Sequence, residues 1–137
     1  MEINDVTGQI IDAAMKVHTA LGPGLLESAY QACLAHELRK RGLVVQTQLV
    51  LPIEYDGTKL DAGYRIDLLV ENCVIVELKA VETMNPIFEA QILSYLKLSK
   101  LEVGLLINFH VPRLKDGLKR IVNNYQGKLT AESAEYR

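Results

Sequence analysis

The stretch Tyr64–Ala80 reads YRIDLLVENCVIVELKA and determines most of the expected fold. Two aliphatic runs flank the polar segment Glu71–Cys73, a pattern typical of two antiparallel strands joined by a short loop. Side chains alternate along a strand, so the apolar faces of the two runs match only if Val70 lies opposite Val74. The sequence therefore predicts a β-hairpin whose loop is Glu71-Asn72-Cys73.

The same register brings two acidic side chains face to face. Asp67 falls opposite Glu77, and Lys79 lies on their side of the hairpin, whereas Ile66 and Leu68 share the other face. Cross-strand neighbours have Cβ atoms about 5 Å apart, and like charges at that separation repel unless a positive group lies between them. The pattern leaves two alternatives, a charged side of a solvent-exposed hairpin or a site for a divalent cation.

A cation site would give these charged residues a chemical role. Carboxylate oxygens are hard ligands that suit Mg²⁺ or Mn²⁺. The cation would neutralise the acid pair, and the lysine could orient an activated water or counter charge on a phosphate. Helices that cover both faces of the sheet would leave little of this side exposed, which favours the cation site over a charged surface.

Hydrophobic spacing and turn residues predict the remaining elements. Helices are expected at about 6–21, 25–41, 86–100 and 113–124, and strands at 43–55, 60–70, 74–80 and 103–109, with a turn at Asp56-Gly57. A meander of three strands followed by a helical crossover into a buried strand implies a mixed sheet with helices on both faces. The expected fold class is α/β, with three α/β/α layers.

Two of the predicted helices carry polar side chains on apolar faces. Glu27 shares a face with Tyr30 and Leu34, where an unpaired carboxylate would be costly to bury. The alternative for Glu27 is a favourable position in the first turn, near the positive end of the helix dipole. Gln91 and Tyr95 lie one turn apart on a later helix, where a core tyrosine hydrogen-bonded to a glutamine is the alternative to a functional pair.

Composition and charge limit the class of protein. The 137 residues are 49% hydrophobic and carry a formal net charge of -2, which predicts one globular domain over residues 1–137. This composition excludes a disordered chain and argues against a polycation that coats nucleic acid. Because no apolar run approaches the ~18 residues of a membrane span, we expect no membrane partner and a cytoplasmic location.

Basic side chains offer a possible contact to a phosphate backbone, and Tyr125 could stack on a base. A solvated helix face is the favoured alternative for these residues. The basic residues are Arg65, Lys97, Lys100, Arg113, Lys115, Lys119 and Arg120.

Four motifs resemble those of a known family. Gly24–Tyr30, GLLESAY, resembles the signature of the GxxExxY proteins, a group within the PD-(D/E)xK nuclease superfamily. Gly63–Asp67, GYRID, resembles the superfamily's metal-binding aspartate motif, and Glu77–Lys79, ELK, resembles its (D/E)xK element. Gln91–Tyr95, QILSY, resembles the QxxxY element of the RecB-like exonuclease branch. The resemblance spans about Gly8–Asn124 and implies a restriction-endonuclease-like fold.

The resemblance also implies roles for the motif residues. Asp67 and Glu77 would hold Mg²⁺ or Mn²⁺, Glu27 would add a ligand or a water contact, and Lys79 would position the nucleophilic water. Two departures from the family pattern are Ile66, in place of the proline that names the superfamily, and Glu27, where many RecB-like enzymes have histidine. The supporting residues, which would fix the site or contact substrate, are Tyr30, Gln91 and Tyr95.

The expected function is divalent-metal-dependent hydrolysis of phosphodiester bonds in nucleic acid, with DNA as the substrate. The alternative is a non-catalytic binding or regulatory subunit, with the nuclease fold, of a DNA-processing or phage-defence assembly. A hydrolase of smaller phosphodiesters is a third possibility. A homodimer is compatible with the apolar residues of the terminal helices.

Overall fold

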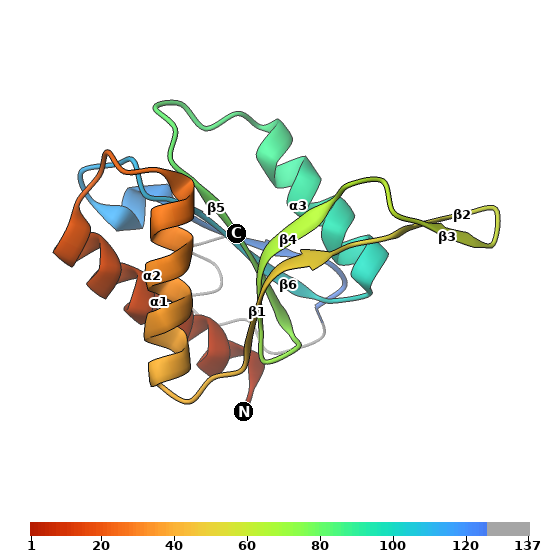
Figure 1. The fold of residues 1–137 in the computed structure, drawn as a ribbon, viewed down its shortest axis with the longest axis horizontal. Helices are drawn as coiled ribbons and strands as arrows, with labels where there is room; N and C mark the ends of the chain where they lie inside the picture. The colour runs from red at the N-terminus through yellow and green to blue at the C-terminus, as the bar shows by residue number, and fades with distance from the viewer. Residues whose placement is uncertain (126–137) are drawn as a thin grey trace.

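The computed structural model describes residues 1–125. Two helices, α1 (Ile3–Leu21) and α2 (Glu27–Lys40), precede a strand-rich region that contains one further α-helix among the described residues (Figure 1). In chain order, the elements after α2 are β1 (Val45–Val50), β2 (Ile53–Tyr55), β3 (Thr58–Leu60), β4 (Arg65–Val70), β5 (Val74–Lys79), α3 (Ile87–Ser99), β6 (Val103–Asn108), the 3₁₀ helix η1 (Leu114–Gly117) and β7 (Leu118–Val122).

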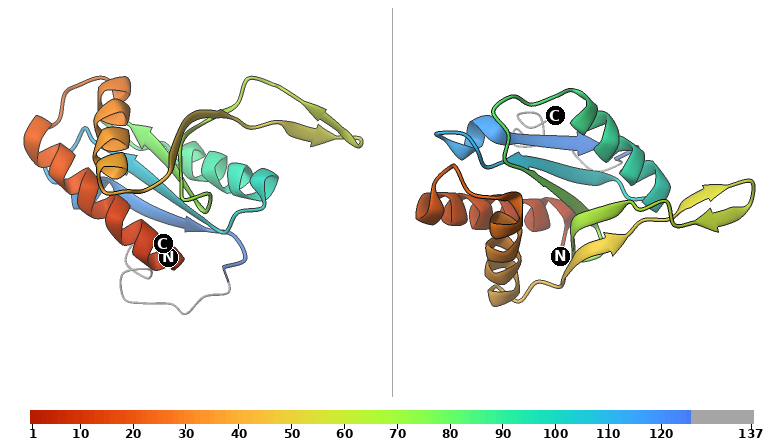
Figure 2. Two further views of the ribbon diagram at one scale, coloured as in Figure 1. Left: turned by 60° about the horizontal axis from the view of Figure 1, so that its bottom comes forward. Right: turned by 45° about the horizontal axis from the view of Figure 1, so that its top comes forward.

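The main sheet of the described chain is mixed, in the order β1-β4-β5-β6-β7. Strands β5 and β6 are parallel and are connected through α3, whereas the other neighbouring pairs are antiparallel. Helices α1 and α2 cover one face and α3 covers the other (Figure 2). These layers confirm the α/β, restriction-endonuclease-like fold class, and the interior position of β6 agrees with its apolar sequence.

The β4–β5 hairpin has the predicted register. Val70 pairs with Val74, and the backbone turns at Glu71 and Asn72, which both have positive φ.

 The two φ angles are 52° for Glu71 and 55° for Asn72, in the left-handed region that short hairpin loops use. The predicted three-residue loop is therefore confirmed.

The predicted long strands 43–55 and 60–70 are wrong, because the structure divides each of them. The end of the first contributes β2, and Leu60 at the start of the second belongs to β3. Among the described residues, β2 and β3 pair only with each other and extend away from the main sheet (Figures 1 and 2). The predicted turn at Asp56-Gly57 is correct, with φ of 53° and 72°. Pro52 lacks the N–H that a continuous ladder needs, and Gly63 turns the returning chain with φ of 87°.

The predicted helix 113–124 is also wrong. Its residues form η1 and the edge strand β7, which pairs with β6. Leu118 and Arg120 alternate along β7 and both point into the interior. This strand alternation is difficult to recognise in the sequence because several of the residues are basic. Only glycine fits at position 117 on this backbone path, because a Cβ atom there would lie 2.2 Å from the carbonyl oxygen of Asn108 and would clash with it.

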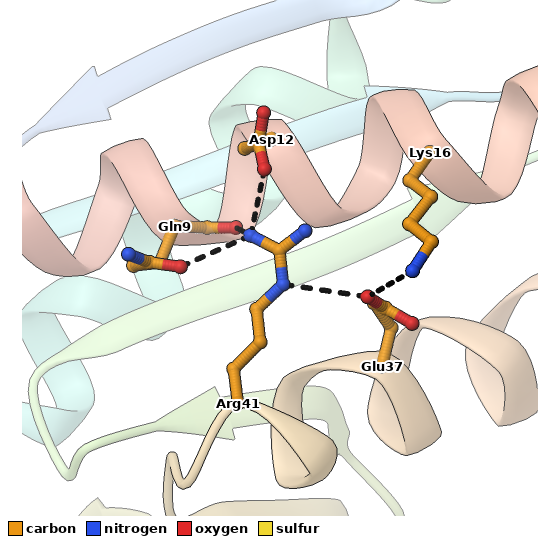
Figure 3. A network of polar contacts seen from close by, with 5 residues as sticks. All are labelled: Gln9, Asp12, Lys16, Glu37 and Arg41. Atoms are coloured by element: carbon orange, nitrogen blue, oxygen red, sulfur yellow. Dashed lines mark hydrogen bonds and ion pairs between the residues drawn. The ribbon is translucent and has the colours of Figure 1, made fainter.

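A polar network joins α1 to α2 (Figure 3). Arg41 contacts Asp12 at 2.8 Å and the Gln9 side chain at 3.0 Å, while Lys16 contacts Glu37 at 3.0 Å. The hydrogen bond from Lys16 is the main reason that the pKa of Glu37 is lowered. The network fixes the position of α2, which carries the predicted site residue Glu27.

The buried apolar side chains form two clusters, which lie on opposite faces of the main sheet. Leu68 and Val70 pack in the cluster beneath α1 and α2, whereas Ile66 packs in the cluster beneath α3. The expectation that Ile66 and Leu68 share a face is therefore wrong. The backbone departs from regular strand geometry here, because Gln48, beside this part of β4, has a φ of 50°. In the described part of the chain, no helix is long and apolar enough to cross a membrane.

Candidate functional site

The β4–β5 ladder opens at Asp67. Regular pairing runs from Val70 and Val74 to Leu68 and Val76. Beyond that point, Oδ2 of Asp67 accepts the backbone N–H of Leu78 at 2.9 Å. The Asp67 side chain thus serves as the hydrogen-bond acceptor that the backbone N–H of Leu78 requires, and this bond orients the carboxylate toward β5.

A glutamine from β1 holds the other oxygen of Asp67. Nε2 of Gln48 donates to Oδ1 of Asp67 at 3.1 Å and to Oε1 of Gln31 on α2 at 2.6 Å. The positive φ of Gln48 is uncommon for a residue other than glycine and often marks a functional site. Sequence reasoning missed Gln48, because a glutamine in an alternating strand resembles an ordinary solvent-facing residue.

Glu77 lies beside Asp67 in the interior of the protein. It is 7% exposed, and among the described residues its Oε1 has no hydrogen-bond partner. Burial raises the pKa of Glu77 to about 10, with further contributions from a hydrogen bond to Asp67 and from the charge of that residue. Lys79 opposes the shift only weakly. In the absence of a cation, the acid pair therefore retains a proton at neutral pH.

The acid pair has the donor chemistry of a divalent-cation site. The free Oε1 of Glu77 and the remaining acceptor capacity of Asp67 are hard oxygen donors suited to Mg²⁺ or Mn²⁺. Within residues 1–125, no group of three or more His, Cys, Asp or Glu could hold a metal ion. Further ligands would come from water or substrate, as is common for Mg²⁺.

Lys79 ends β5 two residues after Glu77, on the same side of the strand. Its side chain extends toward α3, where Nζ lies 4.3 Å from the centroid of the Phe88 ring. Its backbone carbonyl accepts the N–H of Phe109 at 2.9 Å, which fixes the end of the strand. The ammonium group is therefore available on the side of the sheet that α3 covers.

Glu27 is the first residue of α2 and is exposed. Gln31 follows it by one helical turn, so the two side chains lie on the same helix face. Since Gln31 contacts Gln48, which in turn contacts Asp67, this face of α2 is directed toward the acid pair. Glu27 lies on the helix face that carries Gln31, and its role as a metal ligand stays a prediction.

Tyr30 is fully buried and supports the segment that precedes α2. Its hydroxyl donates to the carbonyl of Gly22 at 2.6 Å and accepts the N–H of Leu25 at 3.1 Å. Its ring stacks on Phe109, with centroids 4.4 Å apart. These contacts fit a supporting role better than direct contact with substrate.

Gln91 and Tyr95 approach the acid pair from α3. Burial raises the pKa of Tyr95, with smaller contributions from the charges of Glu77, Tyr64 and Asp67, while a hydrogen bond from Gln91 opposes the shift. Both side chains therefore lie within electrostatic reach of the carboxylates. The structure brings together two acids, a lysine, an amide and a phenol from β4, β5 and α3.

A family model described as the PD-(D/E)XK nuclease superfamily matches residues 4–121. The chain belongs to the PD-(D/E)XK nuclease superfamily. No curated protein and no solved structure matched the chain. Membership supports nuclease activity at the level of the superfamily, whose members typically use divalent metals and act on nucleic acid.

Four of the seven basic residues predicted to contact nucleic acid are engaged within the protein. Arg65 pairs with Asp61, Arg113 with Asp116 and Lys119 with Glu89. Arg120, expected on a solvated helix face, is 1% exposed and donates to side chains of α1, Thr7 and Asn4. The expectation of a basic helix along a phosphate backbone is therefore wrong for Arg120, because β7 directs it into the core.

Proposed function

We propose that this protein is a divalent-metal-dependent nuclease that hydrolyses phosphodiester bonds in DNA. The observation that carries the proposal is the pair formed by Asp67 and the buried Glu77, whose Oε1 has no hydrogen-bond partner among the described residues. The proposal includes membership of the GxxExxY group and similarity to the RecB-like branch. It also includes one domain over residues 1–137 and a cytoplasmic location.

Asp67, Glu77 and Lys79 would have separate roles in hydrolysis. Asp67 and Glu77 would hold Mg²⁺ or Mn²⁺, which supplies Lewis acidity and a more acidic bound water. The contacts from Leu78 and Gln48 keep the Asp67 carboxylate in place before the ion arrives. Lys79 would donate a hydrogen bond to the attacking water or to a phosphate oxygen, where negative charge increases in the transition state.

The remaining polar residues would support this arrangement. Glu27 would accept a hydrogen bond from water at the α2 side of the site. Gln91 and Tyr95 would fix the α3 side, or contact the nucleic-acid backbone, through their amide and hydroxyl groups. Tyr30 would hold the segment before α2 through its bonds to Gly22 and Leu25.

Metal-dependent thermal unfolding and cleavage, measured on the same samples, test the proposal. Mn²⁺ should raise the Tm of the wild-type protein but not that of Asp67→Asn, and Mg²⁺ or Mn²⁺ should support cleavage of plasmid or oligonucleotide DNA. Lys79→Ala should retain the metal-dependent rise in Tm and lose cleavage by roughly 10²–10³-fold. Asp56→Asn, at the exposed turn of the β2–β3 hairpin, is the matched control. Undiminished cleavage by both site variants would refute the proposal.

A binding or regulatory subunit without catalysis is the second candidate function. The ion pairs of Arg65, Arg113 and Lys119 favour it, because a chain with a net charge of -2 then presents less free positive surface to a substrate. A rise in Tm with Mn²⁺, without cleavage of single- or double-stranded DNA or RNA, would support this candidate over the nuclease.

A further inference from the structure

A cavity of about 550 Å³ shares lining residues with the candidate active site. It lies between α3 and the base of the β2–β3 hairpin, and its volume is within the range of small-ligand sites. The lining residues used below are Tyr64, Lys79, Phe88, Gln91, Ser94 and Tyr95. Lys79, Gln91 and Tyr95 belong to both the cavity and the candidate active site, so the cavity lies on the α3 side of that site, although Asp67 and Glu77 do not line it.

Aromatic side chains give the cavity flat surfaces. The rings of Tyr64 and Tyr95 meet edge to face, with centroids 5.9 Å apart, and Phe88 lies beneath the Lys79 ammonium group. Tyr64 is 40% exposed, so its ring is accessible from solvent. Rings of this kind stack on nucleobases whatever the base identity.

Polar groups at the cavity can recognise the edge of a base. The amide of Gln91 offers both a donor and an acceptor, and the hydroxyl of Ser94 offers either. Of the described residues that line the cavity, Lys79 is the charged one, so a neutral planar ring meets no acidic side chain in the wall. The combination of flat apolar surfaces with a few polar groups is typical of sites that hold an extruded base.

We propose that this cavity binds one unstacked nucleobase of the strand whose phosphodiester lies at Asp67 and Glu77, so that the substrate is single-stranded at the point of cleavage. The inference rests on the proposed nuclease function and names its substrate class. Lys79 joins the two subsites, since it borders the cavity and lies on the same side of β5 as Glu77. A base in an intact duplex is stacked and paired, and it reaches such a cavity only after it leaves the helix.

Fluorescence of a short single-stranded oligonucleotide that contains 2-aminopurine tests this inference. Measurements in EDTA report binding without cleavage. Wild-type protein should quench the fluorescence on binding and should bind the single strand more tightly than the corresponding duplex. Phe88→Ala, which removes one stacking surface, should raise the Kd roughly 5- to 150-fold. Phe88→Tyr should retain binding and thereby control for folding.

A second variant fills the cavity instead of enlarging it. Ser94 is exposed on α3, so Ser94→Trp should fold, occupy the cavity and weaken binding to a similar extent. Thr19→Trp, at an exposed position of α1 outside the cavity, is the matched control and should bind as the wild type does. Equal quenching and affinity in Ser94→Trp, Phe88→Ala and wild type would overturn the inference, as would a wild-type protein that does not bind the oligonucleotide.

The same samples separate the base site from catalysis. If wild-type protein quenches 2-aminopurine in EDTA but never cleaves with Mg²⁺ or Mn²⁺, the nuclease proposal fails and the base site stands. If it cleaves DNA but the cavity variants bind and cleave normally, the base site fails and the nuclease proposal stands. Asp67→Asn should lose cleavage while it keeps the quenching.

Discussion

Glu37 and Glu77 are equally inaccessible, at 9% and 7% exposure, yet they have opposite electrostatic environments. Lys16 and Arg41 surround Glu37 in the network of Figure 3, and its pKa is lowered. Glu77 faces Asp67, keeps one oxygen without a hydrogen bond among the described residues, and its pKa is raised to about 10. A buried carboxylate with basic neighbours supports the fold, whereas one beside a second carboxylate is suited to a cation.

Outside the acid pair and Lys79, the largest expected effect concerns the contacts that keep Asp67 in place. Gln48→Ala removes the donor to Oδ1 of Asp67 and the link to Gln31. Metal affinity or the cleavage rate should fall about 10- to 100-fold, the usual effect of losing a group that orients a metal ligand. Titration with Mn²⁺ and cleavage kinetics measure the two effects.

Glu37→Gln is the control for Gln48→Ala, because it changes a buried side chain in the network between α1 and α2 and leaves the acid pair intact. Its Mn²⁺ affinity and cleavage rate should match those of the wild type. A Gln48→Ala protein with wild-type affinity and rate would show that the contact to Asp67 contributes nothing to the site.

Metal affinity should depend on pH through Glu77. The cation requires the ionised carboxylate, so binding must displace the proton that the acid pair holds below a pKa of about 10. The affinity for Mn²⁺ should rise by up to about tenfold for each pH unit between pH 6 and pH 8. Calorimetric titrations in buffers of different ionisation enthalpy would count the released protons. Proton release of zero would contradict the raised pKa.

Glu77→Gln should stabilise the metal-free protein at pH 8. The folded state retains a proton on Glu77 between its ordinary pKa of 4.5 and its folded pKa of about 10, whereas the unfolded state does not. The free energy of unfolding of the wild type should therefore fall as pH rises through this interval. The glutamine amide can donate to Asp67 and never ionises, so we expect a gain of about 1–3 kcal/mol at pH 8.

Urea unfolding in EDTA at pH 5 and pH 8 measures this gain and its pH dependence. The difference between Glu77→Gln and the wild type should be larger at pH 8 than at pH 5. A variant that is less stable than the wild type at pH 8 would mean that Glu77 already has a favourable charged partner in the folded state.

The smallest effect, with the opposite sign, is expected for Glu37→Gln. The folded pKa of Glu37 is lowered, so the ionised carboxylate stabilises the folded state above its ordinary pKa of 4.5. This contribution disappears as pH falls through the lowered folded pKa. Glu37→Gln should therefore have a lower Tm than the wild type at pH 7, and the difference should shrink in acid. A Tm above that of the wild type at pH 7 would remove the contrast with Glu77.

Local patterns predicted the fold well where they coincide with long-range pairing. The register of Val70 with Val74 follows from side-chain alternation alone, and the crossover helix before β6 follows from apolar spacing. Strand β7 was missed because Lys119 and Arg120 conceal its alternation, and the burial of Arg120 depends on α1, at the other end of the sequence. The separate β2–β3 hairpin was missed because nothing in the strand pattern marks where the chain leaves the main sheet.

The acidic residues of the site were predictable from the sequence, whereas the contacts and the cavity around them were not. The hairpin register placed Asp67 near Glu77, since both residues belong to one short segment. The contact from Gln48 depends on a backbone conformation in a different strand. The cavity depends on how α3 packs against the base of the β2–β3 hairpin. Both features arise from tertiary packing, which side-chain alternation does not encode.

Calorimetric titration of Mn²⁺ into wild-type protein and Glu77→Gln at pH 8 tests the central claim most directly. We predict that the wild type binds Mn²⁺ at the acid pair and that Glu77→Gln, although folded and more stable without metal, loses this binding. Unchanged Mn²⁺ affinity in Glu77→Gln would contradict the assignment of the Asp67–Glu77 pair as the metal site.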